Sequence, residues 1–143
     1  MKKKKSTLIG SYARFFVPFK DDFSSFCDIQ LLRSKFEVPE AFKKFNVRIK
    51  AESGYETKIL RSDGGGEYSS KGFKEWPATA GIAHQTTPPY TSQMNGVAER
   101  VNRAVVESAR SQMYGKRVPL KLWGLAVLCA EHVQNRVISN MGK

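Results

Sequence analysis

Two carboxylates stand where a divalent cation could bind: Asp63 follows a strand-like stretch, and Glu99 lies early in a helix-like one. Ligand sites in α/β proteins gather at the carboxyl ends of strands, and Asp63 is placed at such an end, directly before three glycines. Mg²⁺ prefers oxygen ligands and usually takes one or two carboxylates together with water and phosphate. Two such ions can clamp the attacking and leaving oxygens of a phosphoryl transfer. The pair therefore indicates metal-dependent phosphoryl transfer as a candidate chemistry.

Each carboxylate also has an ordinary structural interpretation. Asp-Gly is a common turn pair, so Asp63 could simply begin a turn. Glu99 could form an ion pair with Arg103, four residues later, on a solvated helix face. The helix macrodipole also favours a carboxylate near a helix N-terminus. Taken singly, each residue favours its structural interpretation, and only the two together favour a metal site.

The elements that must position these residues alternate between strand and helix patterns. We expect strands at 12–19 and 26–32, joined by a turn at 20–22, followed by an amphipathic helix at 36–50 with Pro39 in its first turn. Next come a strand at 57–62, a short helix at 69–76 ended by Pro77, a strand at 81–85 and a turn-rich loop at 86–95. Helices at 96–114 and 120–138 complete the chain. This order predicts an α/β domain with a mixed sheet covered by helices.

The charge balance points to a polyanionic partner. The 143 residues carry a net charge of +11, and removing the run Lys2–Lys5 still leaves +7. Nucleic acid is the first expectation and an anionic membrane surface the second. No apolar stretch approaches the length of a membrane span. We expect residues 1–9 to be a basic, disordered N-terminus and residues 10–143 to form one folded domain.

The two cysteines do not form a metal-binding pattern. Cys27 and Cys129 are far apart, and no CxxC or Cys/His cluster exists, which argues against a zinc site. Both lie in apolar surroundings, so we expect buried, reduced thiols, as is typical of intracellular proteins.

The central and C-terminal residues carry a family resemblance. The stretch ILRSDGGGEYSSKGFKEW…GIAHQTTPPYTSQMNGVAERVNRAVVESARSQM…LWGLAV closely resembles the integrase catalytic core of Copia-type (Pseudoviridae) LTR retrotransposons, in the retroviral integrase superfamily. The resemblance runs from about Gly10 to Asn140 and is most specific between Arg61 and Arg103. It implies an RNase H-like fold and a D,D-35-E metal triad.

The resemblance assigns roles to the two carboxylates. Asp63 and Glu99 have 35 residues between them, as the second and third triad members should. It implies that both are catalytic and bind Mg²⁺ or Mn²⁺. In the family these metals serve processing of the element's DNA ends and strand transfer into target DNA.

The first triad Asp has no counterpart in this sequence. In the family it lies on the first strand, in a segment resembling Asp-x-Cys-Gly-Pro, which would fall before Met1. Residues 1–7 contain no carboxylate, and Asp21 and Asp22 match the family's DDFS turn instead. We therefore expect an RNase H-like domain lacking its first, central strand, with little or no strand-transfer activity on its own. A non-enzymatic DNA-binding remnant and a poorly folded transposon relic are the alternatives.

The resemblance also implies a nucleic-acid contact set. Phosphate contacts are expected from basic residues on and near the Glu99 helix, and stacking or hydrogen bonds to bases from the loop before it. Simple solvation or ordinary loop roles remain open for each of these residues: Lys71, Lys74, Tyr90, Gln93, Asn95, Arg100, Arg103 and Arg110.

The remaining expectations concern His84, Trp123 and the partners. We expect His84 to be a hydrogen-bonded histidine at a sheet end rather than a metal or DNA ligand, and Trp123 to lie in the core or a dimer interface. The implied partners are the element's DNA ends, target DNA and a second copy of the chain, with no membrane and no small-molecule substrate. The implied location is the nucleus, or a cytoplasmic particle before import.

Overall fold

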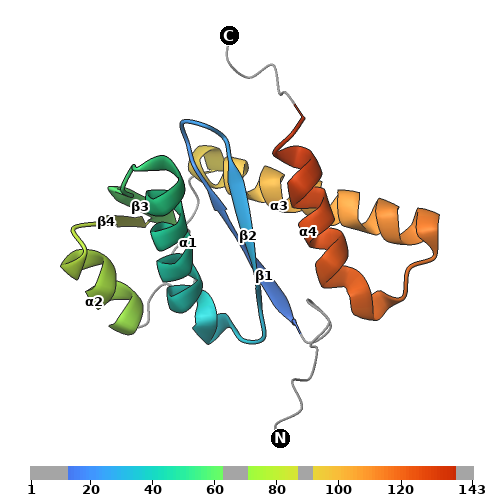
Figure 1. The fold of residues 1–143 in the computed structure, drawn as a ribbon, viewed down its shortest axis with the longest axis horizontal. Helices are drawn as coiled ribbons and strands as arrows, with labels where there is room; N and C mark the ends of the chain where they lie inside the picture. Colours follow the sequence, from blue (N-terminus) through green and yellow to red (C-terminus); the bar gives the residue numbers. More distant parts are fainter. Residues whose placement is uncertain (1–12, 63–70, 87–91, 138–143) are drawn as a thin grey trace, which may run out of the picture. The chain divides into compact units, whose positions relative to one another are not determined.

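The computed structural model describes residues 13–62, 71–86 and 92–137. Its helices and strands follow the predicted order, which confirms the α/β class (Figure 1). Short 3-10 turns at Lys35–Glu37 and Leu120–Leu122 precede two of the helices. The elements are β1 (Phe15–Lys20), β2 (Cys27–Leu32), α1 (Val38–Ser53), β3 (Ile59–Ser62), α2 (Lys71–Thr79), β4 (Ala83–Thr86), α3 (Ser92–Lys116) and α4 (Trp123–Gln134).

The described chain forms two compact units. The first contains the described residues up to Arg33 and from Asn102 onward, hence the β1–β2 hairpin, most of α3, and α4. The second spans Ser34–Val101 and contains α1, β3, α2 and β4. Instead of one mixed sheet, the four described strands form two two-stranded sheets, one in each unit. Among the described strands, none is hydrogen-bonded to both sheets.

In the first unit, β1 and β2 form an antiparallel hairpin whose register places Pro18 opposite Ile29. The backbone N–H groups of Cys27 and Ile29 point out of the hairpin, toward α4. In an antiparallel ladder, when the backbone N–H of one residue points away from the partner strand, the N–H position of the residue opposite it does so too. Pro18, which has no N–H, therefore removes no hydrogen bond from the hairpin.

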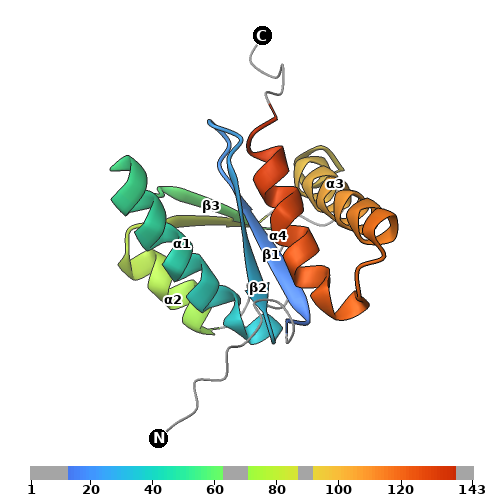
Figure 2. The same cartoon turned by 45° about the vertical axis from the view of Figure 1, so that its right-hand side comes forward.

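Helix α4 lies beside the hairpin and covers the outer edge of β2 (Figures 1 and 2). The Asn135 side chain, just past the end of α4, accepts from the Cys27 N–H at 2.9 Å and donates to the Cys27 carbonyl at 2.7 Å. Glu131 accepts from the Ile29 N–H at 2.8 Å. These three bonds satisfy backbone groups that an exposed strand edge would leave open.

The second unit is built around α1, whose ends are set by local signals. Ser34 and Glu37 form a capping box before it, Pro39 lies in its first turn as predicted, and Gly54 ends it with a positive φ of 74°. Its buried residues recur at helical spacing: Val38, Ala41, Phe42 and Phe45.

Helices α1 and α2 run side by side in both views (Figures 1 and 2). The Phe42 ring, 1% exposed, meets Trp76 edge-on with centroids 5.7 Å apart, and Lys43 lies 5.6 Å from the Trp76 ring. The parallel β3–β4 pair completes the unit, and buried Ile82 donates its N–H to the Pro77 carbonyl at 2.7 Å.

Three sequence-based expectations were wrong. Pro77 does not end its helix but lies buried inside α2, in the last turn, where a missing N–H removes at most one helical bond. Residues 92–95, expected in a loop, belong to α3, which begins at Ser92. Cys129 is exposed rather than buried, since the apolar run of α4 turns Gly124, Ala126 and Ala130 inward instead.

The other cysteine matches expectation. Cys27 is buried, and both thiols are free. Burial, together with the nearby Glu131 and Asp28 carboxylates, raises the pKa of the Cys27 thiol to about 11. Within the described residues, no helix is both long and apolar enough to cross a membrane.

Candidate functional site

The carboxyl ends of β3 and β4 lie next to each other, because the two strands are parallel and in register from Ile59↔Ala83 to Ser62↔Thr86. Ser62 is the last residue of β3 and precedes Asp63 in the sequence. Asp63 itself lies outside the described residues. The strand-end position predicted for Asp63 therefore stays a prediction.

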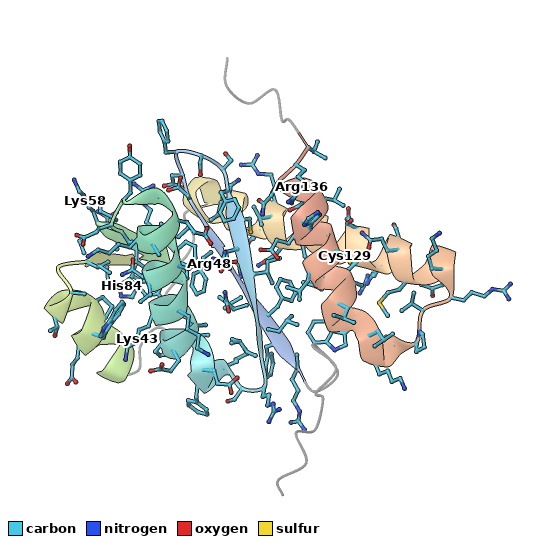
Figure 3. The ribbon with its side chains drawn as sticks, in the orientation of Figure 1. Lys43, Arg48, Lys58, His84, Cys129 and Arg136 are labelled. Atoms are coloured by element: carbon cyan, nitrogen blue, oxygen red, sulfur yellow. The ribbon has the colours of Figure 1, made fainter. Side chains whose placement is uncertain are left out.

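A part-buried hydrogen bond joins the last residue of β3 to the second residue of β4. Ser62 Oγ lies 2.7 Å from His84 Nε2, and Ser62 is only 8% exposed. Which of the two atoms donates depends on the histidine tautomer. His84, labelled in Figure 3, is thus hydrogen-bonded as the sequence predicted, although it is the second residue of β4 and does not lie at the carboxyl end of the strand.

The opposite face of this strand pair is exposed to solvent. Arg61 and Gln85 lie directly opposite each other, and Arg61 Nε donates to Gln85 Oε1 at 3.3 Å. Side chains alternate between the two faces of a strand, so Arg61 and Ser62 must point to different sides. The β3–β4 pair therefore has one part-buried side-chain hydrogen bond, Ser62–His84, and one exposed one, Arg61–Gln85.

Helix α3 presents Glu99 and three arginines to solvent. Glu99, Arg100, Arg103 and Arg110 are all exposed. At about 100° per residue, Arg103 and Arg110 lie within roughly 40° of Glu99 around the helix axis. Arg100 points about 100° away, and its Nε donates to the Gly96 carbonyl at 2.9 Å. Glu99 is not among the ion pairs of the described residues, so the alternative of a salt bridge with Arg103 is not supported.

Several predicted site residues cannot be placed in the same way. Tyr90 is not among the described residues. The backbones of the others belong to α2 or α3, but their side chains are not described: Lys71, Lys74, Gln93 and Asn95. Their predicted nucleic-acid contacts stay predictions.

The turn carboxylates behave as structural groups. Asp21 Oδ2 accepts from the Ser24 backbone N–H at 2.8 Å and from the Ser24 hydroxyl at 2.6 Å. These bonds lower the pKa of Asp21 below 3.8, with the side-chain bond the largest cause. The turn role expected for the Asp21–Asp22 pair is thus supported for Asp21.

The described residues hold part of a metal site at most. No group of three or more His, Cys, Asp or Glu side chains among them could hold an ion. Glu99 is an exposed carboxylate, a suitable oxygen donor for Mg²⁺, but one carboxylate does not make a site. The fit therefore depends on Asp63, which the sequence places one residue beyond the Ser62–His84 bond.

Ser62 is the residue of this region that the sequence did not single out. Its position just before Asp63 was a usable signal, because a small hydroxyl residue at a buried strand end needs a hydrogen-bond partner. The partner could not be identified from the sequence, since it lies 22 residues away on another strand.

Curated relatives of this chain are retrotransposon polyproteins. The chain is 43% identical over 123 residues to the retrovirus-related Pol polyprotein from transposon TNT 1-94 of Nicotiana tabacum, a match covering 86% of the chain and 9% of that protein. It is 32% identical over 126 residues to the Pol polyprotein from transposon RE1 of Arabidopsis thaliana, covering 87% of the chain and 8% of that protein. The chain thus spans less than a tenth of these relatives. No protein-family model matches it.

A solved structure shows the same fold. The HTLV-2 integrase catalytic core domain in complex with magnesium, in its dimeric form, aligns with a TM-score of 0.63 at 19% identity, covering 90% of this chain and 78% of that one. The likeness confirms the RNase H-like architecture that the sequence resemblance implied.

Proposed function

The chain belongs to the integrase catalytic cores of Copia-type retrotransposons, and from that premise we propose that it is the part of a polynucleotidyl transferase that supplies two of three metal-binding carboxylates. Asp63 and Glu99 are these carboxylates, and Mg²⁺ or Mn²⁺ is the ion. When bound, the metal would polarise a phosphodiester and activate the attacking oxygen. The 143 residues lack a third matching Asp, so we expect negligible joining of DNA by this chain alone.

The observation that carries this proposal is the exposed stripe on α3. It combines the Glu99 carboxylate with Arg103 and Arg110 on one side of one helix. The carboxylate suits a hard cation, and the guanidinium groups suit the phosphates of a DNA backbone. Loop contacts by Tyr90, Gln93 and Asn95, and basic contacts by Lys71, Lys74 and Arg100, would extend this surface.

The partners follow from the same assignment. The substrate is DNA, both the element's ends and a target duplex, and the place of action is the nucleus. A second copy of the chain is a further partner, as a related core was solved in a dimeric form.

The metal assignment is tested by titrating Mn²⁺ into the purified chain and following free Mn²⁺ by electron paramagnetic resonance. Asp63→Asn and Glu99→Gln should each weaken Mn²⁺ binding on the order of tenfold or more, because each replaces a carboxylate that coordinates the ion directly. Glu107→Gln is the matched control, since Glu107 is an exposed glutamate on the same helix. Equal affinity in all four proteins would refute the site.

The activity claim needs a separate assay. Joining of a short duplex to target DNA in Mg²⁺ should be at background for the unchanged chain. Robust joining that disappears in Asp63→Asn would overturn the expected inactivity while upholding the metal site.

A second candidate function is DNA binding without chemistry. It is favoured by the net charge of +11 and the exposed arginines of α3. This alternative predicts binding that EDTA and Asp63→Asn leave unchanged.

A further inference from the structure

We propose that His84 is a positioning residue that, through Ser62, holds the carboxyl end of β3 and thereby the backbone from which Asp63 projects. The inference rests on the proposed function in taking Asp63 as a metal ligand. In this role neither His84 nor Ser62 is itself a metal ligand.

The β3–β4 pair depends on side-chain hydrogen bonds between its strands because it is small. β3 and β4 have four residues each and form a two-stranded parallel sheet. Parallel pairing is slightly less stable per residue than antiparallel pairing, and two strands alone are marginal. The position of the last residue of β3 therefore depends on side-chain links between the strands.

Two side-chain links between the strands are seen among the described residues, and they differ in burial. The Arg61–Gln85 bond spans 3.3 Å between two exposed side chains, where water competes for both partners. The Ser62–His84 bond spans 2.7 Å, and Ser62 is buried. A buried polar group that loses its partner stays unsatisfied, whereas an exposed one is hydrated, so the buried link has the larger influence on the strand end.

The direction of the buried link suits a positioning role. His84 lies opposite Leu60 in the register, and Ser62 lies opposite Thr86, so the bond runs diagonally from the last residue of β3 back to the second residue of β4. It therefore opposes both sliding of β3 along β4 and fraying of its end. The Asp63 Cα follows that of Ser62 by about 3.8 Å, so a shift of Ser62 is passed to the aspartate. Metal ligands must be held to within about 0.5 Å, which makes such shifts consequential.

The test compares four single variants, first in the absence of metal and then in a Mn²⁺ titration. His84→Leu and Ser62→Ala remove the bond from either side. His84→Gln is the conservative variant, because the glutamine amide nitrogen is as many bonds from Cβ as Nε2 of histidine. Gln85→Leu is the matched control, since it breaks the exposed link on the same strand pair.

The first readout is amide hydrogen exchange followed by nuclear magnetic resonance. His84→Leu and Ser62→Ala should speed exchange at the Ser62 and Asp63 amides on the order of tenfold, with α1 unchanged. His84→Gln should stay within about threefold of the unchanged protein, and Gln85→Leu should have no effect at these amides. Unchanged exchange in His84→Leu, or an equal rise throughout α1, would overturn the positioning role, the latter because it indicates general destabilisation.

The second readout is Mn²⁺ affinity. His84→Leu and Ser62→Ala should each weaken Mn²⁺ affinity by about tenfold, and the double variant should lose less than the sum of the two, because both substitutions break the Ser62–His84 bond. Additive losses in the double variant would count against the inference. If Asp63→Asn leaves Mn²⁺ affinity unchanged, the proposed metal site fails, and the exchange data still decide whether His84 holds the strand end.

Discussion

Single carboxylates in this chain acquire their roles from the groups around them. Asp21 and Asp63 both stand beside turn-forming residues in the sequence, and both are compatible with a turn. The structure assigns Asp21 to a turn, because Ser24 gives it two hydrogen bonds. A carboxylate whose acceptor sites are occupied in this way is a poor candidate for a metal ligand, which argues against Asp21 in that role.

The Asp21 turn predicts a pH dependence of stability. Its folded pKa lies below the ordinary value of 3.8, so the ionised form is the one stabilised by folding. The contribution is therefore present above pH 3.8 and is lost as the pH falls through the folded pKa. Asp21→Ala should lower the free energy of unfolding near neutral pH, and the difference from the unchanged protein should shrink below pH 3.8. Urea unfolding at a series of pH values measures this.

Ser24→Ala is the informative companion to that experiment. It removes the hydroxyl that is the largest cause of the lowered pKa and leaves the carboxylate in place. Its stability should therefore depend on pH less than that of the unchanged protein in the same acid range. A pH-independent difference between Asp21→Ala and the unchanged protein would contradict this account of the turn.

At the scale of elements, the first unit depends on a helix that completes a strand edge. The Asn135 side chain presents one donor and one acceptor to Cys27, as a neighbouring strand would, and Glu131 continues the pattern at Ile29. This arrangement closes one edge of the hairpin to pairing with other chains.

Asn135→Ala should therefore destabilise the chain by about 1–3 kcal/mol, because it leaves the part-buried N–H and carbonyl of Cys27 without their partner. Thermal or urea unfolding measures the loss. Asn102→Ala, an exposed asparagine on α3 in the same unit, should change stability by less than about 0.5 kcal/mol. Equal effects of the two substitutions would show that the Asn135 hydrogen bonds contribute nothing.

At the scale of the whole molecule, positive charge is the dominant property. Lys and Arg total 24 against 13 Asp and Glu, and the proposed DNA surface on α3 carries three exposed arginines. Binding of a polyanion releases condensed counterions, so affinity should fall steeply with salt.

Replacing Arg100, Arg103 and Arg110 together by glutamine should reduce the slope of log K against log salt by up to about 0.9 for each phosphate that the protein no longer neutralises. The control replaces three other exposed arginines, Arg14, Arg48 and Arg136, by glutamine. Both triple variants therefore lose the same net charge. Fluorescence anisotropy of a labelled duplex over a range of salt concentrations measures both. If the slope falls equally in the two triple variants, charge alone rather than α3 determines binding.

The sequence by itself determined the family, the α/β class, the order of the elements and the two candidate metal ligands. These depend on local information: strand alternation, helical spacing, the capping residues of α1 and the residue types around Asp63 and Glu99. The spacing of 35 residues between those carboxylates is likewise a property of the chain alone. The hydrogen-bonded role of His84 was also predictable in kind, though not in partner.

Only the tertiary structure decided which groups meet. Asn135 and Cys27 are 108 residues apart, and Ser62 and His84 are 22 apart, so no local pattern could pair them. Burial was decided the same way: Pro77 is buried inside α2, and Cys129 faces solvent because Ala126, Val127 and Ala130 occupy the buried face of α4. Local propensity ranks conformations of a segment, whereas partners and burial depend on the packing of distant segments. The proposed Asp63 site follows this division, since the sequence supplies the carboxylate and the Ser62–His84 bond, formed only on folding, holds the strand that carries it.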